Sequence, residues 1–180
     1  QKTAYEIPKR DWSSDVCSSD LTRRRGGGPC SPSRSGVAVT DTPIGVVVVT
    51  HGQLATELLN AAEMIVGELP QFTAVSIGWH DDVDVAREAI ARAISKVDRG
   101  RGVLLLTDMF GGTPANLGLS FLQPEKVDVI TGVNLPMLIK LARTPGSAEL
   151  RTVARELRDH GRTAIRVASE FLQADRPGPA

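Results

Sequence analysis

The sequence predicts an α/β protein with an open, mostly parallel sheet of about four or five strands flanked by helices. Short apolar runs rich in Val, Ile and Leu alternate along the chain with longer segments whose apolar residues recur at helical spacing. The short runs are nearly continuous, which is typical of strands buried on both faces of a parallel sheet. In such sheets, functional sites gather where the strands end at their carboxyl side.

The first strand is expected at Ile44–Val49, a nearly unbroken β-branched run that ends at Thr50-His51-Gly52. A helix follows, because apolar residues recur at helical spacing up to Leu69, and Pro70 closes the segment. The second strand is expected at Phe72–Ile77, where side chains alternate.

The next helix begins near Asp82 and carries an apolar stripe to Val97, where a glycine-rich segment ends it. Val103–Leu106 is predicted as a third buried strand, followed by the loop 107–112. Thr113-Pro114 then has the pattern of an N-cap with proline at the first helical position.

A fourth strand is expected at Val127–Ile130, followed by the loop Gly132–Pro136 and a helix that Pro136 opens. A last helical region begins at Leu150 and is expected to continue past Gly161 toward Phe171. The elements therefore predict one domain over residues 44–173, with a flexible tail at 174–180.

Residues 1–43 lack apolar periodicity and are expected to be a disordered or non-native leader. The run Arg23-Arg24-Arg25 in this leader reads either as a basic tail that binds polyanions or as a solvated segment. Cys17 and Cys30 both lie in the leader, so neither a disulfide framework nor a metal site is indicated. A cysteine-free core suits the cytoplasm, where we expect the protein.

The balance of charged residues does not indicate any class of binding partner. Lys and Arg together number 21, and so do Asp and Glu, among 180 residues. We therefore expect no binding to nucleic acid or directly to an anionic membrane. The chain has no Gly-rich loop with a following Lys and no dinucleotide fingerprint after a strand, so no cofactor is expected.

His51 is the candidate nucleophile, because it is the only good one near neutral pH in the three strand-exit loops. It directly follows a buried strand, and Gly52 behind it lets a phosphate or another chain approach closely. The alternative is a strand-end histidine that packs or caps. His80 and His160 lie in a polar turn and at a helix end, and we expect both to be surface histidines.

Asp108 occupies the equivalent exit of the third strand. A carboxylate there can accept a hydrogen bond from one imidazole nitrogen of His51, fix the tautomer and leave the other nitrogen free to attack. The alternative is a carboxylate that serves a turn or a helix cap. Gly111, Gly112 and Thr113 then offer backbone N–H groups at a helix start, where proteins commonly hold phosphate-like anions.

Three ordered motifs together resemble the mannose-type IIA family of the phosphoenolpyruvate-dependent sugar phosphotransferase system. They are residues 48–52 (VVTHG), residues 107–116 (TDMFGGTPAN) and residues 132–137 (GVNLPM), and the resemblance covers roughly residues 44–172. It implies the IIA fold, with a mostly parallel sheet, in a protein that acts as a phosphotransferase through a phosphohistidine intermediate.

The resemblance also implies the roles of individual residues. His51 would carry the phosphoryl group on Nε2, and Asp108 would orient the ring through Nδ1. Thr50, Gly111, Gly112 and Thr113 would bind the phosphate, without a metal. The implied donor is the phosphorylated carrier protein HPr, and the implied acceptor is a IIB domain or a regulatory protein. Family members are typically homodimers, and the resemblance implies contact with a membrane only indirectly, through a transporter complex.

Other functions stay open at this point. One is a regulatory phosphocarrier with no dedicated sugar transporter, and another is the phosphocarrier subunit of a dihydroxyacetone kinase, against which the loop Phe110–Pro114 argues. A third is a binding module that has kept the fold and lost transfer, which the retention of both His51 and Asp108 disfavours.

Overall fold

The computed structural model of the protein describes residues 42–170. The expected tail at 174–180 and almost all of the expected leader at 1–43 lie outside the described residues. Within them the fold is an α/β sheet with helices on both faces, as the alternation of short and long apolar segments predicts.

Four parallel strands form the sheet, in the spatial order β2-β1-β3-β4. Their bounds are Gly45–His51 for β1, Phe72–Ile77 for β2, Val103–Thr107 for β3 and Val127–Thr131 for β4. The predicted fold class is therefore confirmed. Because β1 lies between β2 and β3, the residue that ends β1 is at the middle of the sheet's carboxyl edge.

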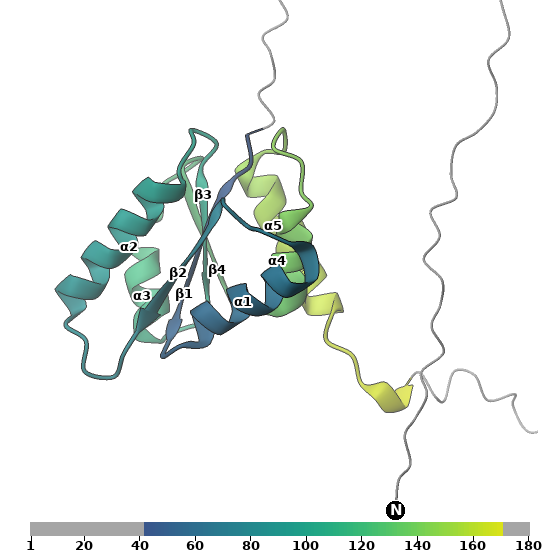
Figure 1. Ribbon diagram of the computed structural model, residues 1–180, viewed down its shortest axis with the longest axis horizontal. Coiled ribbons are helices and arrows are strands. Elements are labelled where there is room, and N and C mark those ends of the chain that lie inside the picture. Colours follow the sequence, from purple (N-terminus) through teal and green to yellow (C-terminus); the bar gives the residue numbers. More distant parts are fainter. Residues whose placement is uncertain (1–41, 171–180) are drawn as a thin grey trace, which may run out of the picture. The chain divides into compact units, whose positions relative to one another are not determined.

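Five helices connect and cover the strands within the described part of the chain. They are α1 (Leu54–Val66), α2 (Val83–Val97), α3 (Thr113–Leu119), α4 (Leu135–Ala142) and α5 (Leu150–Thr163). Figure 1 shows α2 and α3 on one face of the sheet and α1, α4 and α5 on the other. The sheet is thus covered on both faces, which explains why its strands are nearly continuous apolar runs.

The four valines of β1 divide between two hydrophobic cores. Val46 and Val48 pack in the core beneath α1, α4 and α5, whereas Val47 and Val49 pack in the core beneath α2. All four are at most 1% exposed. This division follows from the pleat, which points successive side chains to opposite faces. The end of β1 is consequently held from both sides, and this anchors the residue that follows Thr50.

Three predicted boundaries differ from the structure. The helix expected to reach Leu69 ends at Val66, because Gly67 adopts a φ of 87° that terminates it. The N-cap of α3 is Gly112, and Thr113 is the first helical residue. The last helix does not run through to Phe171: α5 ends at Thr163, and residues 164–167 are not helical.

None of the helices in residues 42–170 combines the length and the apolar character that a membrane span needs.

Candidate functional site

His51 is the last residue of β1, and its side chain is 46% exposed. The fully buried residues before it fix its backbone, while the register with β2 continues through the pair His51 and Ile77. Gly52 then turns the chain with a φ of 55°, and its N–H donates to the Ile77 carbonyl at 2.8 Å. A rigid strand end therefore presents an accessible imidazole.

Asp108 follows the last residue of β3 and contacts His51 twice through the same oxygen. Its Oδ2 atom lies 2.7 Å from His51 Nδ1 and accepts the backbone N–H of His51 at 3.0 Å. Its Oδ1 atom accepts the backbone N–H of Met109 at 2.8 Å. The Asp108 side chain is only 14% exposed. Both oxygens of the carboxylate are thus fixed, and so is the plane that faces the imidazole.

These contacts keep Asp108 ionised. Partial burial alone raises the pKa of its carboxyl group, but hydrogen bonds from the His51 backbone, the His51 ring and the Met109 backbone together outweigh burial. The pKa of Asp108 therefore lies below its ordinary value. An ionised carboxylate only accepts hydrogen bonds, so the hydrogen between the two side chains belongs to Nδ1. In the neutral ring, the lone pair of His51 consequently lies on Nε2.

Gly112 borders the free side of the imidazole. A Cβ atom placed on Gly112 would lie 2.7 Å from His51 Cε1 and 3.3 Å from Nε2. The φ of Gly112 is −79°, so the backbone conformation suits any residue, and the absence of a side chain is required by space alone. Of the expected phosphate-binding residues, Gly112 is the one that lies against the Cε1–Nε2 edge of the ring.

Gly111 and Thr113 lie on either side of Gly112 in the chain. Gly111 has a φ of 82° with no atom near its hypothetical Cβ, and Thr113 begins α3 with an exposed side chain. The Asn116 N–H donates to the Gly112 carbonyl at 2.9 Å, which ties the loop to the first turn of α3. The loop is therefore fixed beside the histidine by the helix that it opens.

Thr50 is placed differently from the expectation that it contacts phosphate. Its side chain is 0% exposed, and its hydroxyl oxygen accepts the backbone N–H of Ala55 at 2.7 Å. A direct phosphate contact by Thr50 has no support in this geometry, because the hydroxyl is buried and engaged with the first turn of α1. Thr50 instead fixes the path of the chain on both sides of His51.

The third expected loop, Gly132–Pro136, adds backbone contacts to this edge. The Thr107 carbonyl accepts the N–H groups of Gly132 at 2.9 Å and Val133 at 3.0 Å, which joins the exits of β3 and β4. Asn134 caps α4 by accepting the Met137 N–H, and its side-chain amide donates to the Gly161 carbonyl of α5. This loop therefore supports the residues beside Asp108 and links α4 to α5.

His80 and His160 are exposed, as expected for surface histidines. Within residues 42–170, no group of three or more His, Cys, Asp or Glu side chains is arranged to hold a metal ion.

Met109 and Phe110 are the neighbours of the site that sequence reasoning passed over. Their side chains are 56% and 76% exposed, although both are large and apolar. The signal was present in the sequence, because two bulky apolar residues directly follow Asp108 in a loop rather than in a patterned element.

The chain matches a family model described as the PTS system fructose IIA component over residues 45–157. It is similar to the PTS system fructose-specific EIIA component of Bacillus subtilis (strain 168), with 29% identity over 131 residues, 72% of this chain and 90% of the relative.

It is also similar to the PTS system mannose-specific EIIAB component of Escherichia coli (strain K12), with 34% identity over 147 residues and 76% of this chain. The chain spans only 43% of the length of that relative. Among solved structures, the PTS IIA protein associated with the fucose utilization operon of Streptococcus pneumoniae aligns with a TM-score of 0.66 and 26% identity. That alignment covers 73% of this chain and 98% of the other.

Proposed function

This chain belongs to the IIA component family of the sugar phosphotransferase system, and we propose that His51 is the residue on which it carries the phosphoryl group. The chain is a phosphocarrier of that system. The observation that carries the proposal is the contact of 2.7 Å between Asp108 Oδ2 and His51 Nδ1, which leaves the lone pair of an exposed imidazole on Nε2.

The chemical step is an exchange of one N–P bond for another. The Nε2 lone pair of His51 attacks the phosphorus of a phosphohistidine on the donor protein, and the electron pair of the breaking N–P bond returns to the donor's imidazole nitrogen. The phosphorylated ring of His51 keeps its hydrogen on Nδ1 and becomes positively charged. Ionised Asp108 stabilises that charge and holds the ring in line with the donor.

Gly111, Gly112 and Thr113 are the proposed phosphate-binding residues. Phosphoryl transfer needs donors around the equatorial oxygens more than it needs covalent chemistry from the protein. A Cβ atom on Gly112 would lie 2.7 Å from His51 Cε1. Because glycine has no Cβ, there is room for a phosphoryl group on the adjacent Nε2. Backbone N–H groups of this loop would then contact the oxygens, without a metal.

The transfer of the phosphoryl group to and from His51 requires a donor protein and an acceptor protein. We assign phospho-HPr as the donor and a IIB domain or a regulatory protein as the acceptor, since both must reach the exposed edge of His51. A phosphohistidine intermediate makes the protein a phosphotransferase whose product is another phosphorylated protein.

We also propose that the protein is a homodimer, with residues 44–173 as the functional domain. Two observations support self-association: β4 is an edge strand in the described sheet, and Ile165 and Val167 are 75% and 55% exposed. Light scattering on the purified chain should give twice the monomer mass, and a monomer mass at micromolar concentration would contradict the dimer.

The test of the proposed site is labelling by phosphoenolpyruvate, enzyme I and HPr. The wild-type chain should gain one phosphoryl group, and His51→Ala should gain none while keeping its circular dichroism spectrum. His80→Ala and His160→Ala are matched controls, because both histidines are exposed and should be dispensable. A His51→Ala protein that is still labelled would refute the proposal.

A further inference from the structure

A cleft of about 700 Å³ lies at the amino edge of the sheet, opposite the edge that carries His51. It is bordered by residues 100–101 before β3, by residues 122–125 with the first residues of β4, and by residues 149–151 at the start of α5. The strand from Gly45, which pairs with Val103, to His51 is about 20 Å long. The cleft is therefore separate from the site at His51, and its volume is typical of small-molecule sites.

Backbone hydrogen bonds fix the wall of the cleft before β4. The Gln123 carbonyl accepts the N–H groups of Lys126 at 3.0 Å and Val127 at 2.9 Å, and the Val127 carbonyl accepts the Gln123 N–H at 3.1 Å. The Lys126 carbonyl accepts the Val103 N–H at 2.8 Å, which joins this turn to β3. Glu125 in the turn has a φ of 63°, a conformation that is uncommon for residues with a side chain. This wall is therefore a preformed part of the fold.

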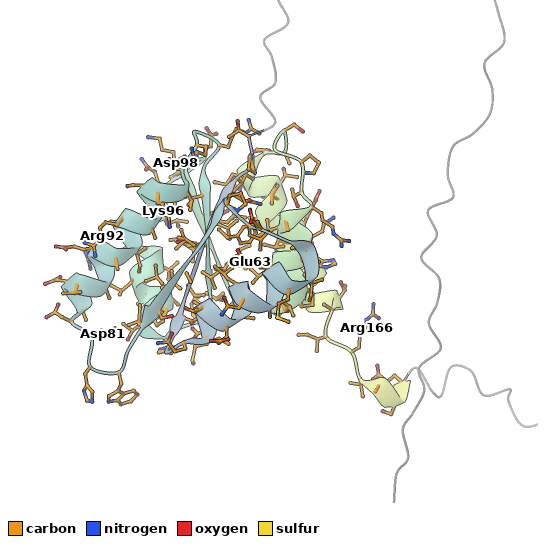
Figure 2. The ribbon with its side chains drawn as sticks, in the orientation of Figure 1. Glu63, Asp81, Arg92, Lys96, Asp98 and Arg166 are labelled. Carbon is orange, nitrogen blue, oxygen red and sulfur yellow. The ribbon has the colours of Figure 1, made fainter. Side chains whose placement is uncertain are left out.

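The opposite wall is built around Arg101. Asp98 holds the preceding turn, because its Oδ1 atom accepts the Gly100 N–H at 2.8 Å. Figure 2 shows Asp98 at this end of the sheet and Asp81 at the other end. The Nη2 atom of Arg101 donates to the Ala148 carbonyl, just before α5, at 3.0 Å. This contact fixes the guanidinium beside the start of α5.

The contact with Ala148 does not account for the whole guanidinium of Arg101. Its Nε atom is buried and has no hydrogen-bond partner, and Arg101 forms no ion pair with any described carboxylate. A partly buried charge without a partner costs free energy. Arg151 borders the same cleft and also forms no ion pair within the described residues. The two arginines therefore give the cleft an end that suits an anion.

The rest of the cleft carries hydrogen-bond acceptors. Gln123, Glu125 and Asp128 all border it. The Oδ1 atom of Asp128 accepts the Val129 N–H at 2.8 Å, and no described residue donates to its Oδ2 atom. Carboxylate and amide oxygens accept hydrogen bonds from hydroxyl groups, whereas they repel a second anionic group. This end of the cleft therefore suits a polyhydroxy molecule.

The number of positive charges favours phosphate over carboxylate as the anionic group. A phosphate monoester carries a charge of about −2 at neutral pH and several acceptor oxygens, which matches two guanidinium groups. A carboxylate carries one negative charge and would neutralise only one of the two arginines.

We propose that the cleft binds a small phosphorylated polyol of the size of a hexose phosphate. The phosphate lies between Arg101 and Arg151, and the hydroxyl groups face Gln123 and Asp128. The inference goes beyond the proposed function and does not depend on it, because the cleft contains no residue of the site at His51.

Isothermal titration calorimetry with four probes tests the ligand class. Glucose 6-phosphate should bind saturably, at one site per chain. Inorganic phosphate lacks the hydroxyl groups, glucose lacks the anion, and gluconate has a carboxylate in place of the phosphate. All three should therefore bind more weakly than glucose 6-phosphate.

Arg151→Gln tests the anionic end, because it removes a charge-assisted contact and should raise the Kd for glucose 6-phosphate roughly 10-fold or more. Arg155→Gln is the matched control. Arg155 is exposed on the same helix but does not border the cleft, so its loss should change the Kd by less than about twofold. Arg101→Lys keeps a charge and a donor for the Ala148 carbonyl, and should still weaken binding because it lacks the guanidinium.

Asp128→Asn tests the end that faces the hydroxyl groups. Asparagine keeps an oxygen for the Val129 N–H and removes the negative charge. The preference for glucose 6-phosphate over inorganic phosphate should fall, while inorganic phosphate should bind no more weakly than to the wild type.

NMR mapping locates the bound ligand. Glucose 6-phosphate should shift resonances of residues 122–128 and 149–151 and leave those of His51 and Gly112 in place, and His51→Ala should bind it with wild-type affinity. The inference is overturned by the absence of saturable binding, by equal losses in Arg151→Gln and Arg155→Gln, by another probe that binds as tightly, or by shifts centred on His51. Failure of the proposed function would appear instead in the labelling of His51, which these measurements do not use.

Discussion

The Oδ2 atom of Asp108 lies 2.7 Å from Nδ1 of His51 and 3.0 Å from the backbone nitrogen of the same residue. One carboxylate oxygen thus fixes both the position of the strand end and the orientation of the ring. Because β1 and β3 are adjacent and parallel, this contact joins two strand exits that lie 57 residues apart in the sequence.

Asp108→Asn tests whether Asp108 fixes the tautomer of the His51 imidazole. The amide nitrogen of Asn can donate to Nδ1, which would move the ring hydrogen to Nε2 and remove the nucleophilic lone pair. We expect phosphoryl transfer from phospho-HPr to slow on the order of 10- to 100-fold, as when a carboxylate that orients a metal-bound histidine is lost. Stopped-flow or quench kinetics measure this rate, and a wild-type rate would remove the proposed role of Asp108.

Gly112→Ala tests the space beside Nε2. The new methyl group would lie 2.7 Å from His51 Cε1, so the ring must move from the position that Asp108 gives it. We expect slower labelling of His51 and shifted imidazole resonances in NMR spectra.

Gly118→Ala is the control for this substitution, because Gly118 lies in α3, the helix that Gly112 caps, and its Cβ would have no contact closer than 3.7 Å. It should label normally and leave the imidazole resonances in place. Equal labelling rates in the two variants would show that Gly112 is not required for space.

Thr50→Val separates a structural role of Thr50 from phosphate contact. Valine keeps the shape but leaves the buried Ala55 N–H without its acceptor, at a cost of about 1–3 kcal/mol in the free energy of unfolding. Thr50→Ser keeps the hydroxyl and should retain most of the stability. Urea denaturation measures both, and a Thr50→Val protein as stable as wild type would contradict the structural role.

The pKa of Asp108 predicts how stability depends on pH. In the folded protein this pKa lies below its ordinary value of 3.8, so ionised Asp108 stabilises the fold above that pH. The contribution is lost as the pH falls below the ordinary value and through the folded value. The difference in unfolding free energy between wild type and Asp108→Asn should shrink as the pH falls below about 4. A difference that grows below about pH 4 would contradict this.

The sequence predicts the strands and the two facing side chains of the site because both depend on local pattern. The β-branched run of β1 and the leucines of β3 are buried on both faces, which leaves few alternatives to a parallel sheet. Two parallel strands that end at the same edge then bring His51 and Asp108 together, whatever the details of the loops.

The parts that could not be predicted depend on contacts between elements. Thr50 precedes His51 in the sequence motif, which suggests a role at the site. Once α1 packs against the sheet, however, the Thr50 hydroxyl oxygen accepts the backbone N–H of Ala55. A glycine at position 112 could be required by its backbone conformation or by the space around it. Only the position of the His51 ring shows that the lack of space for a side chain is the reason.

The most direct test of the central claim is to identify the phosphorylated atom. The wild-type chain would be phosphorylated with phosphoenolpyruvate, enzyme I and HPr, and then studied by phosphorus-31 and proton–nitrogen NMR together with peptide mapping. The predicted result is one acid-labile phosphoryl group on Nε2 of His51. A phosphoryl group on Nδ1, on His80 or on His160, or none at all, would contradict the account.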